Sequence, residues 1–138
     1  MLQCHVVTRW ISVTGLLLAM WSCGSGVDRP ELAAVSGTVT FKGQPLEQGS
    51  IIFLSDNNRP ALGKIANGQI TEVTTFEPGD GAPVGPSKVI IASMENPSAD
   101  MYAPSKSLLP AKYGKPEESG LSVDLKPGQN EVKFELTP

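Results

Sequence analysis

The stretch VSGTVTFKGQPLEQGSIIFL, residues 35–54, decides the fold class of this chain. Residues 35–41 alternate between apolar or glycine positions and small polar ones, which is the period of a strand with one buried face. Gly43 and Pro45 then turn the chain, and the continuous apolar run at residues 50–54 is typical of a central strand. The sequence therefore predicts two strands joined by a short turn.

Outward from this stretch, strand-like segments continue to the end of the chain. They are rich in β-branched residues and bounded by Gly and Pro, at residues 61–66, 69–75, 88–93, 121–125 and 131–136. Asn67-Gly68 predicts a type I′ hairpin, and Pro127-Gly128 predicts a type II turn that joins the last two strands into a hairpin. We therefore expect an all-β fold, an antiparallel β-sandwich of about seven strands with Greek-key connections.

The N-terminus reads as an export signal. Residues 1–22 combine a basic start with a short apolar run, and small residues surround Cys23. LAMWSC, residues 18–23, resembles the lipobox of bacterial lipoproteins, which implies cleavage before Cys23 and acylation of its thiol. Ordinary cleavage near Gly24 or Gly26 and an uncleaved anchor are the alternatives. We expect a signal peptide at 1–22, a flexible tether at 23–32 and one domain at 33–138.

The composition of the chain after residue 22 limits the reactions and ligands that the protein can support. After residue 22 there are 116 residues with 10 basic and 14 acidic side chains, a net charge of −4, and no basic cluster that would bind nucleic acid. That part holds no histidine and only one cysteine. Histidine-dependent triads and disulfides are thereby excluded. We expect no catalytic residue, no metal and no cofactor.

Residues 94–119 lack a clear strand pattern and contain four prolines. The first interpretation is a crossover pinned to the core by Leu108, Leu109 and Tyr113; the second is a binding surface; the third is a hidden strand or helical turn. The candidate binding surface consists of Tyr102, Leu108, Leu109 and Tyr113. For Tyr113, burial with a bonded hydroxyl is the favoured expectation.

Two further chemistries remain open. Glu77 and Asp80 could offer carboxylates to a calcium ion, although turn formation explains the same residues. Lys42 and Asn130 could form an intramolecular amide beside the carboxyl group of Glu72. Strand-end positions favour solvent exposure for these three residues instead.

A family resemblance follows from the turns. VSGTVTFKGQPL at 35–46, followed by GSIIF at 49–53, resembles the opening of carboxypeptidase regulatory-like domains, which share a transthyretin-like β-sandwich. DGAPVG at 80–85 before KVII resembles the glycine turn of the same family. The resemblance implies an extracytoplasmic module for structure and protein contacts, and it implies no catalytic residue.

Together these features predict a non-enzymatic, lipid-anchored β-sandwich in the cell envelope, facing the periplasm or the exterior. Its expected partners are the membrane, through the N-terminal lipid, and a protein. The alternative is a lipoprotein that binds a small ligand, a carbohydrate or an ion.

Overall fold

The computed structural model describes residues 28–95 and 105–138. The expected signal peptide at 1–22, Cys23 and Tyr102 lie outside the described residues. No helix among residues 28–95 and 105–138 has the length and apolarity needed to cross a bilayer. The elements are β1 (Leu32–Phe41), β2 (Gln44–Pro45), β3 (Gln48–Leu54), β4 (Ala61–Ala66), β5 (Gln69–Thr74), β6 (Ala82–Pro83), β7 (Gly85–Ala92), η1 (Ala111–Gly114), β8 (Ser122–Leu125) and β9 (Gln129–Leu136).

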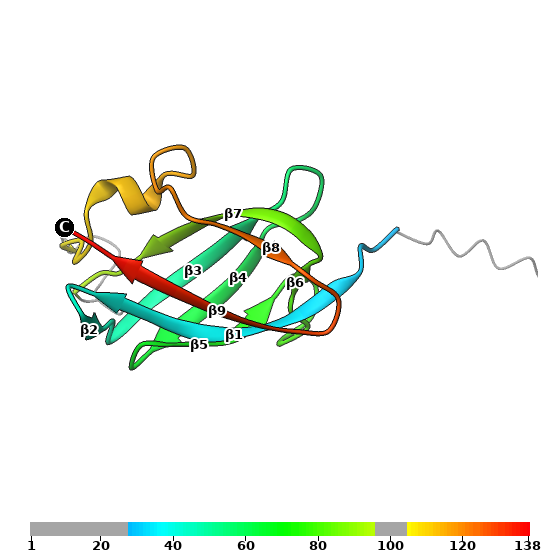
Figure 1. The fold of residues 1–138 in the computed structure, drawn as a ribbon, viewed down its shortest axis with the longest axis horizontal. Helices are drawn as coiled ribbons and strands as arrows, with labels where there is room; N and C mark the ends of the chain where they lie inside the picture. Colours follow the sequence, from blue (N-terminus) through cyan, green and yellow to red (C-terminus); the bar gives the residue numbers. More distant parts are fainter. Residues whose placement is uncertain (1–27, 96–104) are drawn as a thin grey trace, which may run out of the picture.

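The strands form one curled sheet in the order β2-β1-β5-β4-β3-β7-β8, with β6 and β9 also paired to β1. Figure 1 shows β1 and β9 in front of β3 and β4, so the sheet folds over its own inner face. The prediction of an all-β, sandwich-like fold is confirmed, and each of the seven predicted strands is present. The two-residue strands β2 and β6 were not predicted, because two residues carry no periodic pattern.

The last predicted hairpin is wrong. β8 pairs with β7, whereas β9 runs parallel to β1 over eight residue pairs, from Ala34 with Gln129 to Phe41 with Leu136. The turn at Pro127 and Gly128 therefore carries the chain from one side of the curled sheet to the other. The other strand pairs among the described residues are antiparallel.

The hairpin at Asn67-Gly68 is confirmed. Both residues have positive φ angles, 50° and 76°, as a type I′ turn requires. The turn also packs under the first loop, where the N–H of Gly68 donates to the carbonyl oxygen of Leu46 at 2.7 Å. This contact fixes the β4–β5 hairpin against the β2 region.

One apolar core lies inside the curl. It is built from inward-facing positions of the long strands and from the segment after β7, and its fully buried large members are Val39, Ile51, Phe53, Val89, Ile91, Leu125 and Leu136. The alternation of β4 illustrates the cause: Ala61, Gly63 and Ile65 are buried while the intervening residues are exposed.

The segment after β7 closes one end of the opening between β7 and β9. Tyr113 is buried, and its hydroxyl donates to the carbonyl oxygen of Thr137 at 3.0 Å while accepting from the N–H of Thr137 at 2.8 Å. On the other side, the Ser119 hydroxyl donates to the carbonyl oxygen of Val89 at 2.8 Å. The expected burial of Tyr113 with a bonded hydroxyl is confirmed, and η1 is the helical turn of the third interpretation.

Candidate functional site

The solvent side of the central strands carries an apolar cluster. Along β3, Ile51 and Phe53 point into the core, so Ile52 and Leu54 point outward. Ile52 pairs with Leu62 of β4 on one side and with Ile90 of β7 on the other, so these three side chains form one row across the sheet. We call the set Ile52, Leu54, Leu62 and Ile90 the outer patch.

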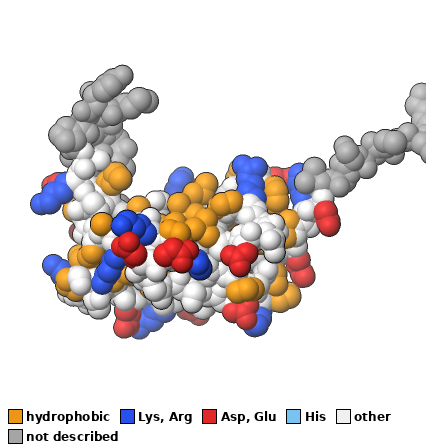
Figure 2. Space-filling model, turned by 90° about the horizontal axis from the view of Figure 1, so that it is seen from above, with side chains coloured by type: hydrophobic (Ala, Val, Ile, Leu, Met, Phe, Trp, Pro, Cys, Tyr) orange, Lys and Arg blue, Asp and Glu red, His pale blue; other side chains and the backbone are white. Residues whose placement is uncertain are grey.

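The outer patch is open to solvent among the described residues. Leu62 keeps 55 % of its surface exposed, and the three other members are half-buried. Figure 2 shows a face of the molecule on which hydrophobic side chains gather between acidic and basic ones. An antiparallel sheet that meets water on one side normally places polar residues there, so these four positions depart from the rule.

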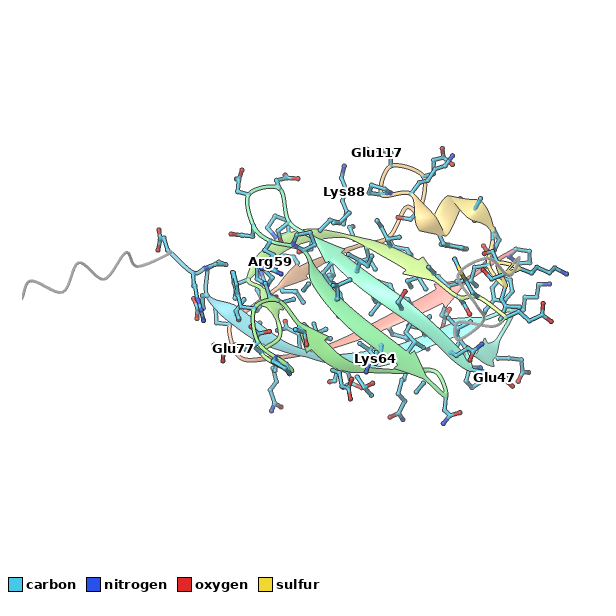
Figure 3. All side chains as sticks on the ribbon, turned by 180° about the vertical axis from the view of Figure 1, so that it is seen from behind. Glu47, Arg59, Lys64, Glu77, Lys88 and Glu117 are labelled. Carbon is cyan, nitrogen blue, oxygen red and sulfur yellow. The ribbon has the colours of Figure 1, made fainter. Side chains whose placement is uncertain are left out.

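Two ion pairs border the outer patch. Lys64 of β4 contacts Glu72 at 2.5 Å, and Lys88 of β7 contacts Glu117 at 2.8 Å. Figure 3 looks onto this side of the sheet and shows Lys88 and Glu117 close together, with Lys64 farther along it. The hydrogen bond from Lys88 to Glu117, together with the charge of that carboxylate, raises the pKa of Lys88 above its ordinary value. Both pairs are exposed, so they contribute little to stability.

A β-bulge places Glu72 on the outer side. The register between β4 and β5 shifts between Leu62 and Lys64, and Glu72 adopts a φ of 51°. As a result, Thr71 and Glu72 are consecutive exposed residues, although a regular strand would alternate. The bulge therefore builds one of the two ion pairs at the border.

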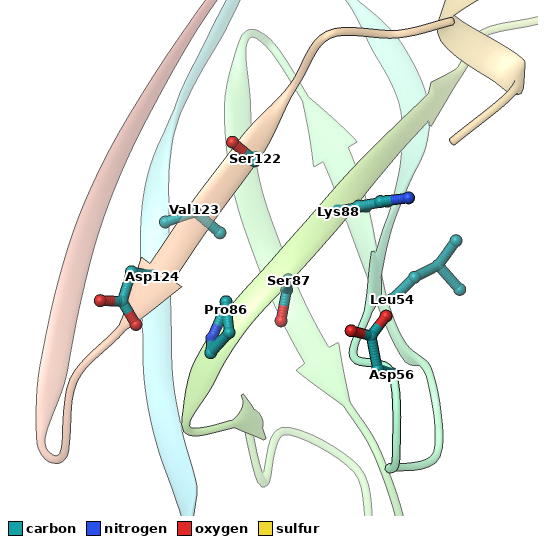
Figure 4. Close-up of a pocket in the computed structure, with 8 residues that line it drawn as sticks. All are labelled: Leu54, Asp56, Pro86, Ser87, Lys88, Ser122, Val123 and Asp124. Carbon is teal, nitrogen blue, oxygen red and sulfur yellow. The ribbon is translucent and has the colours of Figure 1, made fainter. Parts of the chain in front are cut away.

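Two hollows flank the outer patch. The smaller, of about 290 Å³, lies between β3, β7 and β8, and Leu54 and Lys88 line it together with Asp124 (Figure 4). The larger, of about 560 Å³, lies beyond Ile52 along the strands, with Ser50 and Lys64 among its lining residues. The two hollows lie on either side of the apolar row along the strand direction and make the surface there uneven.

The outer patch combines an apolar centre with charged residues at its border. Residues 28–95 and 105–138 contain no group of three histidine, cysteine, aspartate or glutamate side chains placed to hold a metal ion. Ser87, which lines the smaller hollow, is buried, and its hydroxyl lies 2.9 Å from the hydroxyl of Ser55. An apolar centre with a charged border is the anatomy of a protein–protein interface.

The residues predicted as a binding surface separate in the structure. Leu109 and Tyr113 belong to the core, where they pack at one end of the opening between β7 and β9. Leu108 points outward with 42 % of its surface exposed, and Tyr102 lies outside the described residues. Two of the four side chains are therefore inaccessible to a partner.

The proposed amide cross-link between Lys42 and Asn130 is excluded by distance. Asn130 pairs with Val35, whereas Lys42 follows the last residue of β1. Seven residues of extended strand separate these positions, roughly 23 Å. Glu72 forms its ion pair with Lys64 elsewhere on the sheet.

The loop after β5 uses its carboxylates internally. One oxygen of Asp80 accepts the N–H of Thr75 at 2.6 Å, and the other accepts those of Phe76 and Glu77, each at 2.9 Å. The carboxylate of Glu77 contacts Arg29 at 3.2 Å. These contacts are those of a closed turn, as the turn interpretation of this loop predicts.

These contacts make Asp80 a source of acid sensitivity. Desolvation raises the pKa of Asp80, but the backbone N–H donors outweigh it and leave that pKa below 3.8. Because the pKa of Asp80 is lower in the folded than in the unfolded state, its ionised carboxylate stabilises the fold above about pH 4. This stabilisation is lost as the pH falls through the folded-state pKa. We expect Asp80→Asn to lower the melting temperature at pH 7 and to flatten its decline below pH 4.

The measurement is the melting temperature from pH 2 to pH 7, followed by circular dichroism. Asp124→Asn is the matched control, since that exposed carboxylate contacts Lys126 instead of the backbone of a loop. Equal acid slopes for the wild type and Asp80→Asn would contradict the assignment.

Comparison of the chain with protein-family models, with curated proteins and with solved structures found no match. The outer patch therefore rests on geometry. The sequence held a signal for it: the runs SIIFL and KVIIA stay apolar at positions that strand alternation sends outward.

Proposed function

We propose that this protein is a non-enzymatic, lipid-anchored module of the cell envelope that binds another protein through the outer patch. The observation that carries the proposal is the row formed by Ile90, Ile52 and Leu62 on the solvent side of the sheet, bordered by two Lys–Glu pairs. A partner with an apolar centre of its own would bury this row, while the ion pairs would remain at the solvent-exposed rim of the interface.

The anchor part of the proposal rests on the sequence. Acyl chains on Cys23 would each contribute about 0.8 kcal/mol per buried methylene, and two or three chains give long-lived attachment. The chain from Cys23 to Leu32, where β1 begins, is short. Arg29 is already fixed to Glu77 and lies over the Phe76 ring at 5.2 Å. Such a tether would hold the domain close to the bilayer.

The relationship to carboxypeptidase regulatory-like domains is also a proposal. It is supported by the motif at residues 35–46 and by a sandwich-like sheet. It agrees with a role in contacts, since the resemblance carries no catalytic residue.

A small ligand in the larger hollow is the second candidate function. Its volume of about 560 Å³ falls in the range of ligand pockets. A ligand that binds the folded state alone would raise the melting temperature. A thermal-shift screen with sugars, metal ions and small metabolites would detect it, and Lys64→Ala should remove the shift.

The protein-contact proposal is tested by Leu62→Asp. A carboxylate at this exposed position should leave the melting temperature nearly unchanged, yet it would be desolvated in an interface. Cross-linking in native membranes followed by quantitative mass spectrometry should show specific neighbours of the wild type that are depleted about tenfold with Leu62→Asp. Lys42→Ala, in the turn after β1, is the control. Identical neighbour profiles for all three proteins would refute the outer patch.

The anchor is tested separately by Cys23→Ala, which should move the protein from the membrane fraction to the soluble fraction. The intact mass of the wild type should show loss of residues 1–22 and gain of acyl chains. A Cys23→Ala protein that stays in the membrane fraction after cleavage at another site would contradict the anchor.

A further inference from the structure

The edge of β9 is open on one side. Among the described strands, β9 pairs with β1 alone, and β8, which precedes it in the chain, pairs with β7. Two hydrogen bonds show which backbone groups of β9 face β1. The N–H of Ala34 donates to the carbonyl oxygen of Gly128 at 2.9 Å, and the N–H of Lys42 donates to the carbonyl oxygen of Leu136 at 3.2 Å. In a parallel ladder alternate residues point both backbone groups to the same neighbour, so the even-numbered residues of β9 bond to β1.

The odd-numbered residues then point their N–H and carbonyl groups toward the open side. Thr137 also points its backbone groups toward the open side. Its N–H and its carbonyl group both bond to the Tyr113 hydroxyl, which caps the C-terminal end of the edge. At the other end, the Asn130 side chain closes the turn on Lys126, with bonds of 2.9 and 2.7 Å. Between these caps, no described strand pairs with the open side of residues 131–135.

The side chains along this edge alternate in charge. Glu131, Lys133 and Glu135 are all exposed, and Lys133 contacts Glu135 at 2.8 Å. Charge protects an edge against indiscriminate pairing, but alternating charge is complementary to the same sequence in an antiparallel strand of suitable register. The open edge therefore fits a second copy of itself.

We propose that two copies of this protein pair antiparallel through β9, with Val132 opposite Val132 and Glu131 opposite Lys133 of the second copy. In this register the outward backbone groups of residues 131 and 133 meet as hydrogen-bonded pairs, and opposite charges face each other on both sides of the two-fold axis. Centring the pair on Lys133 would oppose like charges. Centring it on Phe134 would need the groups of Thr137 that Tyr113 already occupies.

Charge reversal with rescue tests the register. Lys133→Glu should weaken self-association of the full-length protein in detergent about tenfold, because it sets glutamates opposite each other at two places. The double variant Glu131→Lys with Lys133→Glu recreates opposite charges in the exchanged order and should restore the dimer. Sedimentation equilibrium measures the dissociation constants, and circular dichroism confirms that each variant is folded.

Two controls separate this dimer from the proposed partner site. Lys42→Glu changes the net charge as much as Lys133→Glu does, and Leu62→Asp alters the outer patch; neither should weaken the dimer. A wild type that sediments as a monomer at every concentration, or a double variant that stays as weak as Lys133→Glu, would overturn the proposal. Cross-linking of the β9 edge to a different protein instead of a second copy would overturn it as well.

Discussion

Phe53→Ala is expected to lower the free energy of unfolding by about 3–5 kcal/mol. Phe53 lies near the C-terminal end of β3, is completely buried, and is the largest of the fully buried side chains among the described residues. β3 is itself held between β4 and β7, so the backbone around residue 53 cannot collapse into the space that the ring leaves. Single domains of this size are typically stable by about 5–15 kcal/mol, so the variant should be marginal.

Urea denaturation followed by fluorescence or circular dichroism measures the effect. Leu62→Ala is the matched control, because Leu62 is an aliphatic residue of the adjacent strand β4 that is mainly exposed. Its cost should stay within about 0.5 kcal/mol. Equal costs for the two variants would mean that the inner and outer faces of the sheet are wrongly assigned.

Gly37→Ala is expected to cost about 3 kcal/mol. Gly37 lies in β1 directly opposite Val132 of β9, and a Cβ atom at this position would meet the Val132 carbonyl oxygen at 1.9 Å. That oxygen belongs to the backbone, so relief requires the two strands to move apart. The parallel pairing of β1 with β9 would lose hydrogen bonds or core contact on either side of the substitution.

Gly114→Ala provides the control for Gly37→Ala. Gly114 ends η1, and a Cβ atom there would have no neighbour within 4 Å. The melting temperature of Gly114→Ala should match that of the wild type, while that of Gly37→Ala should fall by several degrees or more. A Gly37→Ala protein as stable as the wild type would argue against close parallel contact between β1 and β9.

Local sequence patterns were sufficient to predict the seven strands and the hairpin at Asn67-Gly68. The alternation at residues 35–41 and the Asn67-Gly68 turn act over a few residues, and both have the predicted form. The Pro127-Gly128 turn and its two strands were predicted, but the predicted pairing of these strands with each other is wrong. A turn fixes the local direction of the chain, whereas the choice between β8 and β1 as neighbour of β9 depends on how the whole sheet curls.

The candidate site was harder to predict. Tyr113 and Leu109 were predicted as surface residues in one interpretation and as core residues in another, because a proline-rich segment has no period that separates inside from outside. The outer patch depends on four residues from three strands, which only the sheet register brings together. The bulge at Glu72 also left no periodic signal, since it breaks the alternation on which strand prediction relies.

The most direct measurement is site-specific photo-cross-linking of the full-length protein in native membranes, with a photoreactive residue in place of Leu62. The outer patch predicts a discrete adduct with another protein at this position. The adduct should disappear when Ile52→Asp is added, and it should be absent when the photoreactive residue replaces Lys42. Equal labelling at both positions, or an adduct that survives Ile52→Asp, would contradict a protein-binding role for the outer face of the sheet.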